Sequence, residues 1–215
     1  MARVPLTAGS SGGPGPDDSI RPKSNGCKSC ALGASSGYDL DLEKARHLIQ
    51  KSGARRIGLQ APEGLKRFLP VLARQIEDLT GAEVVISGDP CFGACDLDLI
   101  LAGEVDLMLH LGHAELGEGD EKTIFLEARM DCSLSSAAKK AVSALRERRI
   151  GLATTIQHVH RLEEALKALR VEGIEAIVGP SGGRIRHPGQ VLGCCYSSVR
   201  GLDVEEFLFL GTGRF

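Results

Sequence analysis

The chain has 215 residues, enough for one large domain or two small ones. A formal net charge of −2 gives no electrostatic basis for broad nucleic-acid or membrane-surface binding, and an aromatic content of 4% argues against stacking platforms for single-stranded nucleic acid. No apolar run approaches the roughly 20 residues of a membrane span, and the N-terminus lacks the apolar centre of a signal peptide. We therefore expect a cytoplasmic protein with no nucleic-acid or membrane partner.

Residues 1–37 are rich in Gly, Ser and Pro and offer little apolar surface to bury, so we expect a disordered tail. This tail contains Cys27 and Cys30 in the pattern CKSC. Zinc needs four ligands and no second pair with matching spacing follows, so these two thiols are interpreted as incidental. The chain has seven cysteines, and in a reducing compartment metal ligands or free thiols are expected rather than disulfides.

From Tyr38 onward, helical apolar spacing alternates with short apolar runs typical of buried strands. The pattern predicts helices over 41–53, over 63–81 and over 97–104. It predicts strands over 55–60, 83–87, 106–112 and 122–128. Strands that alternate with helices indicate a parallel sheet with helices on both faces.

The chain then repeats itself, because RRIGL occurs at 55–59 and again at 148–152. Each copy follows one predicted helix and precedes another, and IEAIVG takes the place that EVVISG takes in the first copy. We therefore predict two duplicated Rossmann-like α/β units, over 38–130 and 131–201. The apolar run near the C-terminus is interpreted as the first strand of a truncated third unit, over 202–215.

Cysteines follow the second strand of both predicted units. Cys91 lies in GDPCFGACDLD of the first unit, and Cys194 lies in the equivalent loop of the second. Ligands gather at the carboxyl ends of parallel strands, so units that face one another would bring these thiols to a shared cleft. Thiolates favour iron–sulfur clusters or zinc. The alternative, a small core filler, is favoured for Cys95 and Cys132.

Four motifs in order carry a resemblance that runs from Tyr38 to Phe215. QAPEGL, GDPCFGACDLD, HLGHAEL and GQVLGC together resemble the archaeal diphthamide biosynthesis enzymes, the 2-(3-amino-3-carboxypropyl)histidine synthases. The resemblance implies three domains related by duplication, each donating one cysteine to a [4Fe–4S] cluster. By motif match, Cys91 looks like the first ligand and Cys194 like the second. The third domain and its cysteine do not follow Phe215, so we expect a fragment or split form, with a truncated inactive version as the alternative.

The same resemblance implies a reaction. The cluster would donate an electron to S-adenosylmethionine, and the released 3-amino-3-carboxypropyl group would add to C2 of a histidine on translation elongation factor 2. A homodimer is expected on the same basis. Two other functions stay open at this point: a non-catalytic homologue that binds the synthase or the elongation factor, and a redox or zinc protein that uses Cys91, Cys95 and Cys194.

Other candidates for cofactor binding follow the predicted strands. Gln60, Glu63 and Gly64 lie where a helix N-terminus could bind the carboxylate of S-adenosylmethionine, although Glu63 could simply start the helix. His113 and His110 end the third strand and could hydrogen-bond the cofactor or orient the target imidazole, or His110 could only fill a polar rim.

Basic residues flank the second cysteine loop. Arg184, Arg186 and His187 could attract a carboxylate or an acidic stretch of a protein substrate, or could form a solvated loop. His158 and His160 open a helix and are expected on the surface.

Overall fold

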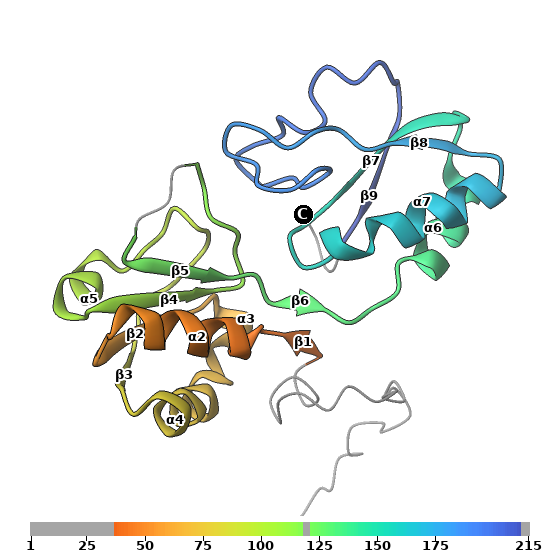
Figure 1. Cartoon of the computed structure of the whole chain (residues 1–215). Coiled ribbons are helices and arrows are strands. Elements are labelled where there is room, and N and C mark those ends of the chain that lie inside the picture. Colours follow the sequence, from red (N-terminus) through yellow and green to blue (C-terminus); the bar gives the residue numbers. More distant parts are fainter. Residues whose placement is uncertain (1–36, 118–120, 212–215) are drawn as a thin grey trace, which may run out of the picture.

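The computed structural model describes residues 37–117 and 121–211. Two α/β units lie side by side in Figure 1, one coloured orange to green and the other green to blue. The predicted tail, with Cys27 and Cys30, falls outside the described residues apart from Gly37.

The first unit contains a four-stranded sheet in the order β3-β2-β4-β5, and every pairing in it is parallel. The strands are β2 (Arg56–Gln60), β3 (Glu83–Ile86), β4 (Leu107–Leu111) and β5 (Thr123–Leu126). The apolar runs that predicted these strands are buried, and all five residues of β4 are shielded from solvent. The predicted parallel sheet is confirmed.

Helices cover both faces of this sheet, as predicted. On one face, α2 (Leu42–Ser52) and α4 (Leu69–Thr80) pack into the main core of the unit. On the other face, α5 (Leu99–Glu104) packs through a smaller cluster around Met108. A glycine in the left-handed conformation ends both α2 and α4, at Gly53 and Gly81.

The single helix predicted over 63–81 is wrong, because the structure divides it into α3 (Glu63–Lys66) and α4. The break has a physical reason in Pro70, which lies in the first turn of α4. A proline there needs no backbone N–H, whereas inside one continuous helix it would remove a hydrogen bond and clash with the preceding turn.

The second unit contains a three-stranded parallel sheet in the order β8-β7-β9. Its strands are β7 (Arg149–Thr154), β8 (Glu175–Ile177) and β9 (Phe207–Leu210), and its helical segments are α6 (Ser135–Ala141), η2 (Val142–Ala144), η3 (Val159–Arg161) and α7 (Leu162–Val171). The core combines Ile150 and Leu152 of β7 with Ala165 and Leu169 of α7.

The strand β9 corrects one prediction. The apolar run near the C-terminus was assigned to a third unit, but Phe207–Leu210 pairs with β7 of the second unit, opposite residues 151–154. The order β8-β7-β9 repeats the order β3-β2-β4 of the first unit. An apolar run does not indicate its strand partner, and a long irregular segment separates β9 from β8, so the sequence could not show this pairing. The second unit therefore extends to Leu210.

A matching carboxylate in each unit supports the equivalence of β9 and β4. Asp106, just before β4, accepts two hydrogen bonds of 2.9 Å from the backbone N–H groups of Arg55 and Arg56. Glu206, just before β9, accepts two of 2.9 Å from the N–H groups of residues 146 and 147, which precede β7. Both units thus tie the start of the central strand to the start of its neighbour in the same way.

A short antiparallel pair lies where the chain leaves the first unit. β1 (Tyr38–Asp39) pairs with β6 (Arg129–Met130), the segment that leaves the first unit. The Met130 N–H also donates to the carbonyl oxygen of Gln157 in the second unit, at 2.9 Å.

None of the helices in residues 37–117 and 121–211 has the length and apolar character that crossing a bilayer requires.

Candidate functional site

The carboxyl ends of the two sheets face each other. Gln157, in the loop after β7, donates from Nε2 to the carbonyl oxygen of Gly112, just after β4, at 2.9 Å. His187 lies between β8 and β9, and its Nε2 is 2.5 Å from a carboxylate oxygen of Glu127, just after β5. The loops that follow strands in one unit therefore contact the loops that follow strands in the other.

The basic loop before Cys194 is part of this contact. Arg186 pairs with Glu115 of the first unit at 3.6 Å, beside the pair formed by His187 and Glu127. Two of the three residues predicted to attract a carboxylate thus bind carboxylates within the same chain. They hold the second unit against the first.

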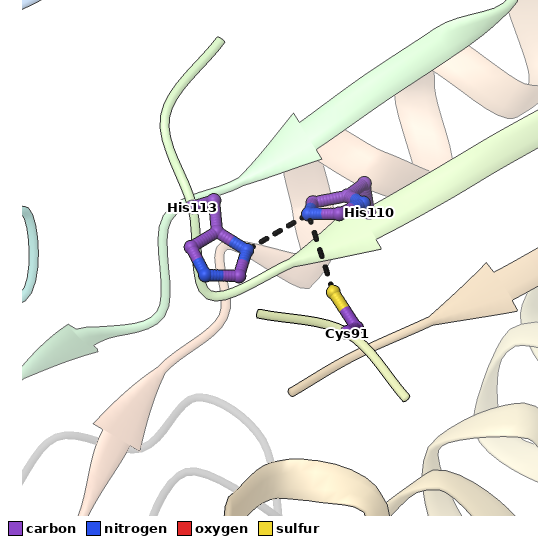
Figure 2. Close-up of side chains that lie close together, drawn as sticks. All are labelled: Cys91, His110 and His113. Atoms are coloured by element: carbon purple, nitrogen blue, oxygen red, sulfur yellow. Dashed lines mark hydrogen bonds between the residues drawn. The ribbon is translucent and has the colours of Figure 1, made fainter. Parts of the chain in front are cut away.

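Cys91 lies buried at this edge of the first sheet, in the loop after β3, and is 2% exposed. Its Sγ is 3.9 Å from Nε2 of His110, a fully buried residue of β4. The same Nε2 is 2.8 Å from Nδ1 of His113, in the turn after β4. Figure 2 shows the sulfur and the two rings converging, and the ligand atoms of all three residues lie within 4.8 Å of one another.

Gln60 fixes the orientation of His110. Its Nε2 donates to the carbonyl oxygen of Asp96 at 2.8 Å, so its Oε1 faces the N–H of Asp98 at 3.3 Å and Nδ1 of His110 at 3.1 Å. An amide oxygen only accepts, so His110 carries its proton on Nδ1. The lone pair of Nε2 is then directed at Cys91 and His113.

The three side chains are uncharged near neutral pH. Burial, reinforced by the negative charge of Asp96, raises the pKa of the Cys91 thiol to about 11. Burial, with His113 adding to it, lowers the pKa of His110 to about 4, and burial also lowers the pKa of His113. Both imidazoles are therefore neutral, the form in which imidazole binds a metal, and Cys91 loses its proton only when a metal replaces it.

The residues predicted at the start of α3 have different surroundings. Gln60 is buried under His110, and its nearest partners are those given above. Glu63 is exposed and pairs with Lys66 at 2.6 Å, and Lys66 also donates to the carbonyl oxygens of Gly88 and Asp89, which fixes the start of the Cys91 loop. Gly64 is exposed, with open space beside it. Cofactor binding by these residues stays a prediction.

Cys194 is exposed at the tip of a tight turn. The N–H and carbonyl groups of Leu192 and Cys195 bond to each other across this turn, at 2.9 and 3.1 Å, and leave Gly193 and Cys194 as its two central residues. The structure thus groups Cys91 with His110 and His113, and Cys194 is not a member of that group.

Two expectations about buried and exposed residues are wrong. Cys95 and Cys132, expected as core fillers, are both exposed. His158, expected on the surface, is 1% exposed, because its N–H donates to the carbonyl oxygen of Thr155 in a tight turn that directs the ring inward. His160 is exposed, as predicted.

Residues 61–215 match the family model of diphthamide synthesis proteins. The chain belongs to this family. It is 39% identical over 175 residues to the 2-(3-amino-3-carboxypropyl)histidine synthase of Pyrococcus horikoshii, a match that covers 78% of this chain and 50% of the relative. It is 34% identical over 191 residues to subunit 1 of the Danio rerio synthase, covering 84% of this chain and 48% of the relative. The chain therefore spans about half the length of these curated relatives.

The fold is also that of a solved member of the family. The crystal structure of Dph2 from Pyrococcus horikoshii with a 4Fe–4S cluster superposes with a TM-score of 0.72 at 35% identity, and covers 82% of this chain and 53% of that one. The family resemblance and the α/β fold predicted from the sequence are confirmed.

The donor chemistry of this chain fits an iron–sulfur cluster. Clusters are held by cysteine thiolates, and Cys91 and Cys194 are both free thiols in equivalent loops. Both loops lie at the carboxyl ends of sheets that face each other.

Sequence reasoning weighed His110 but missed its bond with Gln60. The register could have revealed it, because Gln60 and His110 are direct partners on neighbouring strands. Strand register, however, is not readable from one sequence.

Proposed function

We propose that this chain forms part of an enzyme that transfers the 3-amino-3-carboxypropyl group from S-adenosylmethionine to a histidine of translation elongation factor 2. Its family membership and its identity to named 2-(3-amino-3-carboxypropyl)histidine synthases support the pathway. The observation that carries the proposal is the burial of a free thiol, Cys91, at an edge where both units present their carboxyl-end loops.

In this proposal Cys91 and Cys194 hold a [4Fe–4S] cluster, and a third thiolate comes from a further unit like those of the longer relatives. When bound, the cluster supplies the electron that cleaves the bond between sulfur and the aminocarboxypropyl carbon of S-adenosylmethionine. The 4Fe–4S cluster in the crystal structure of Dph2 from Pyrococcus horikoshii supports this assignment.

The residues of this chain orient and shield the reactants. Gln60 holds His110, and His110 accepts the Nδ1–H of His113. The second ring nitrogen of His113 points away from His110 in Figure 2, so it is available to bond the cofactor or the target imidazole. The N-terminus of α3, with Glu63 and Gly64, is proposed to bind the cofactor's carboxylate.

The contact between units contributes water exclusion. The pairs of His187 with Glu127 and of Arg186 with Glu115 close one side of the region between the sheets. Excluding water there would protect a reactive carbon fragment from side reactions.

A homodimer is proposed for the assembled enzyme.

Anaerobic reconstitution with iron and sulfide tests the proposal. The chain should turn brown and hold about four irons and four sulfides per site, and on reduction it should cleave S-adenosylmethionine into the aminocarboxypropyl fragment. Cys91→Ser and Cys194→Ser should each reduce iron content. Cys132→Ser, which removes an exposed thiol in the connector, is the matched control and should retain it.

Two results would contradict the proposal. Iron binding that is indifferent to both Cys91 and Cys194 would remove the cluster assignment. A chain that binds no iron under any condition, yet binds the elongation factor, would instead support a non-catalytic homologue.

A further inference from the structure

The group of Cys91, His110 and His113 has the composition of a complete local metal site. One thiol and two neutral imidazoles converge from three parts of the first unit: the loop after β3, the strand β4 and the turn after β4. A cluster liganded by cysteines uses no imidazole, so the two neutral nitrogen ligands beside Cys91 remain available to another metal ion.

The distances are close to those of tetrahedral coordination. Zinc–sulfur and zinc–nitrogen bonds of about 2.3 and 2.1 Å place a sulfur about 3.6 Å from each nitrogen and the nitrogens about 3.4 Å apart. Here Sγ of Cys91 is 3.9 Å from Nε2 of His110, and that Nε2 is 2.8 Å from Nδ1 of His113. For an ion to bind, the two nitrogens would have to separate by about 0.6 Å and the sulfur would have to approach Nε2 of His110 by about 0.3 Å.

The surroundings orient the ligands in advance. Metal-bound histidines usually donate their second N–H to a fixed acceptor, and Gln60 fills that role for His110. Gln60 is held in turn by the carbonyl oxygen of Asp96 and the N–H of Asp98. His113 has only to carry its proton on Nε2 for Nδ1 to face the ion.

A cavity lies on the other side of Gln60, the residue that contacts His110. The cavity has a volume of about 330 Å³ and is lined by Gln60 and by residues of the Cys91 loop, with Asp89, Asp96 and Asp98 among them. Carboxylates around this cavity favour a cation near the Cys91 loop. His113 is half-buried, so the group is reachable at one corner.

We propose that Cys91, His110 and His113 form a mononuclear site for a divalent ion of the zinc class, and that an ion bound there prevents Cys91 from binding an iron–sulfur cluster. On binding, the Cys91 thiol releases its proton to solvent and its sulfur bonds the ion, while each histidine donates one nitrogen lone pair and water takes the fourth position. The site shares Cys91 with the proposed function but requires neither Cys194 nor a third thiolate.

Titration of the metal-free full chain with Co²⁺ tests the site. To remove the CKSC pair, the background is Cys27→Ser/Cys30→Ser. One ion per chain should give thiolate-to-cobalt charge transfer and the strong visible bands of tetrahedral cobalt. Cys91→Ser should abolish the charge transfer, and His113→Ala should weaken the visible bands. Gln60→Ala should lower affinity about 10- to 100-fold.

The matched control is Cys95→Ser, which removes an exposed thiol in the same loop and should change nothing. The proposed site is overturned if the cobalt spectrum lacks the charge-transfer band. It is also overturned if the spectrum is unchanged in both Cys91→Ser and His113→Ala. If Cys91→Ser fails to fold, the His113→Ala variant provides the test instead, because His113 is only half-buried.

Preloading with one equivalent of Zn²⁺ tests the exclusion. Iron incorporation on later reconstitution should fall several-fold, and a chelator should restore it. Undiminished iron incorporation would overturn the exclusion.

Cys194→Ser separates the two proposals, since it should reduce the cluster but leave cobalt binding intact. A cobalt site without any cluster counts against the proposed function alone. A cluster without a cobalt site counts against this inference alone.

Discussion

Among the glycines that the structure describes, Gly179 has the least room for an added side chain. It follows β8 and leads into the segment that carries Cys194. A methyl group at its Cα would lie 1.5 Å from the backbone carbonyl oxygen of Ser198. Ser198 is 1% exposed and donates from Oγ to the carbonyl oxygen of Gln190, so burial and this hydrogen bond both restrict its movement away from Gly179.

The cost of Gly179→Ala follows from that geometry. Reaching even a 3.0 Å separation requires the Ser198 carbonyl or residue 179 to move by 1.5 Å, and the moving atom is backbone rather than a flexible side-chain end. Forced overpacking costs typically about 1–3 kcal/mol. For a chain of this size each kcal/mol lowers Tm by about 2–4 °C, so the expected drop is about 2–12 °C.

Thermal unfolding followed by circular dichroism measures this drop, with Gly193→Ala as the matched control. Gly193 is exposed in the same segment and an added methyl meets no atom within 4 Å, so its effect should stay within about 0.5 kcal/mol. Because Gly179→Ala displaces the segment around Cys194, it should also lower iron content after reconstitution. Equal melting temperatures for the two variants would refute the packing argument.

Three further predictions concern contacts within and between the units. Gly151→Ala should destabilise the chain, because its methyl would lie 2.3 Å from the Phe207 ring, and adding Phe207→Ala should recover part of the loss in a double-mutant cycle of unfolding free energies. Burial raises the pKa of Glu127, but hydrogen bonds from His187 and a neighbouring arginine outweigh it and hold the pKa below its usual 4.5. A depressed folded-state pKa contributes stability above pH 4.5, and this contribution is lost as the pH falls through the folded-state pKa. The Tm advantage of wild type over Glu127→Gln should therefore shrink as the pH falls below 4.5, and a pH-independent difference would contradict this. Asp106→Ala should speed hydrogen exchange at the two backbone amides that this carboxylate binds, and unchanged exchange there would show that the bonds do not protect them.

Most elements of the fold could be predicted from the sequence, because buried parallel strands require apolar runs and the helices between them require an apolar face. The runs at 55–60 and 106–112 became β2 and β4 within a residue or two of the expected bounds. The repeated RRIGL correctly indicated two units with equivalent central strands. Strand partners are set by tertiary contacts instead, so β9 was assigned to the wrong unit.

The candidate site was predictable in its location and less so in its composition. The rule that ligands bind at the loops after parallel strands indicated Cys91, which the structure groups with His110 and His113. The group does not include Cys194, and its role as a cluster ligand stays a prediction. The network of Gln60, His110 and Asp96 depends on which strands lie side by side and on amide orientation. Neither property is encoded in residue spacing, so the partnership of His110 with Cys91 required coordinates.

The pairing of β1 with β6 suggests where fluorescent dyes could be attached to this protein. Tyr38, at the start of the first unit, pairs with Met130, where the polypeptide leaves the first unit for the second. A donor dye attached at exposed Gly37 would therefore lie next to this pair, and an acceptor dye at exposed Arg200 would lie on the second unit. Energy transfer between the two dyes would report motion of one unit relative to the other.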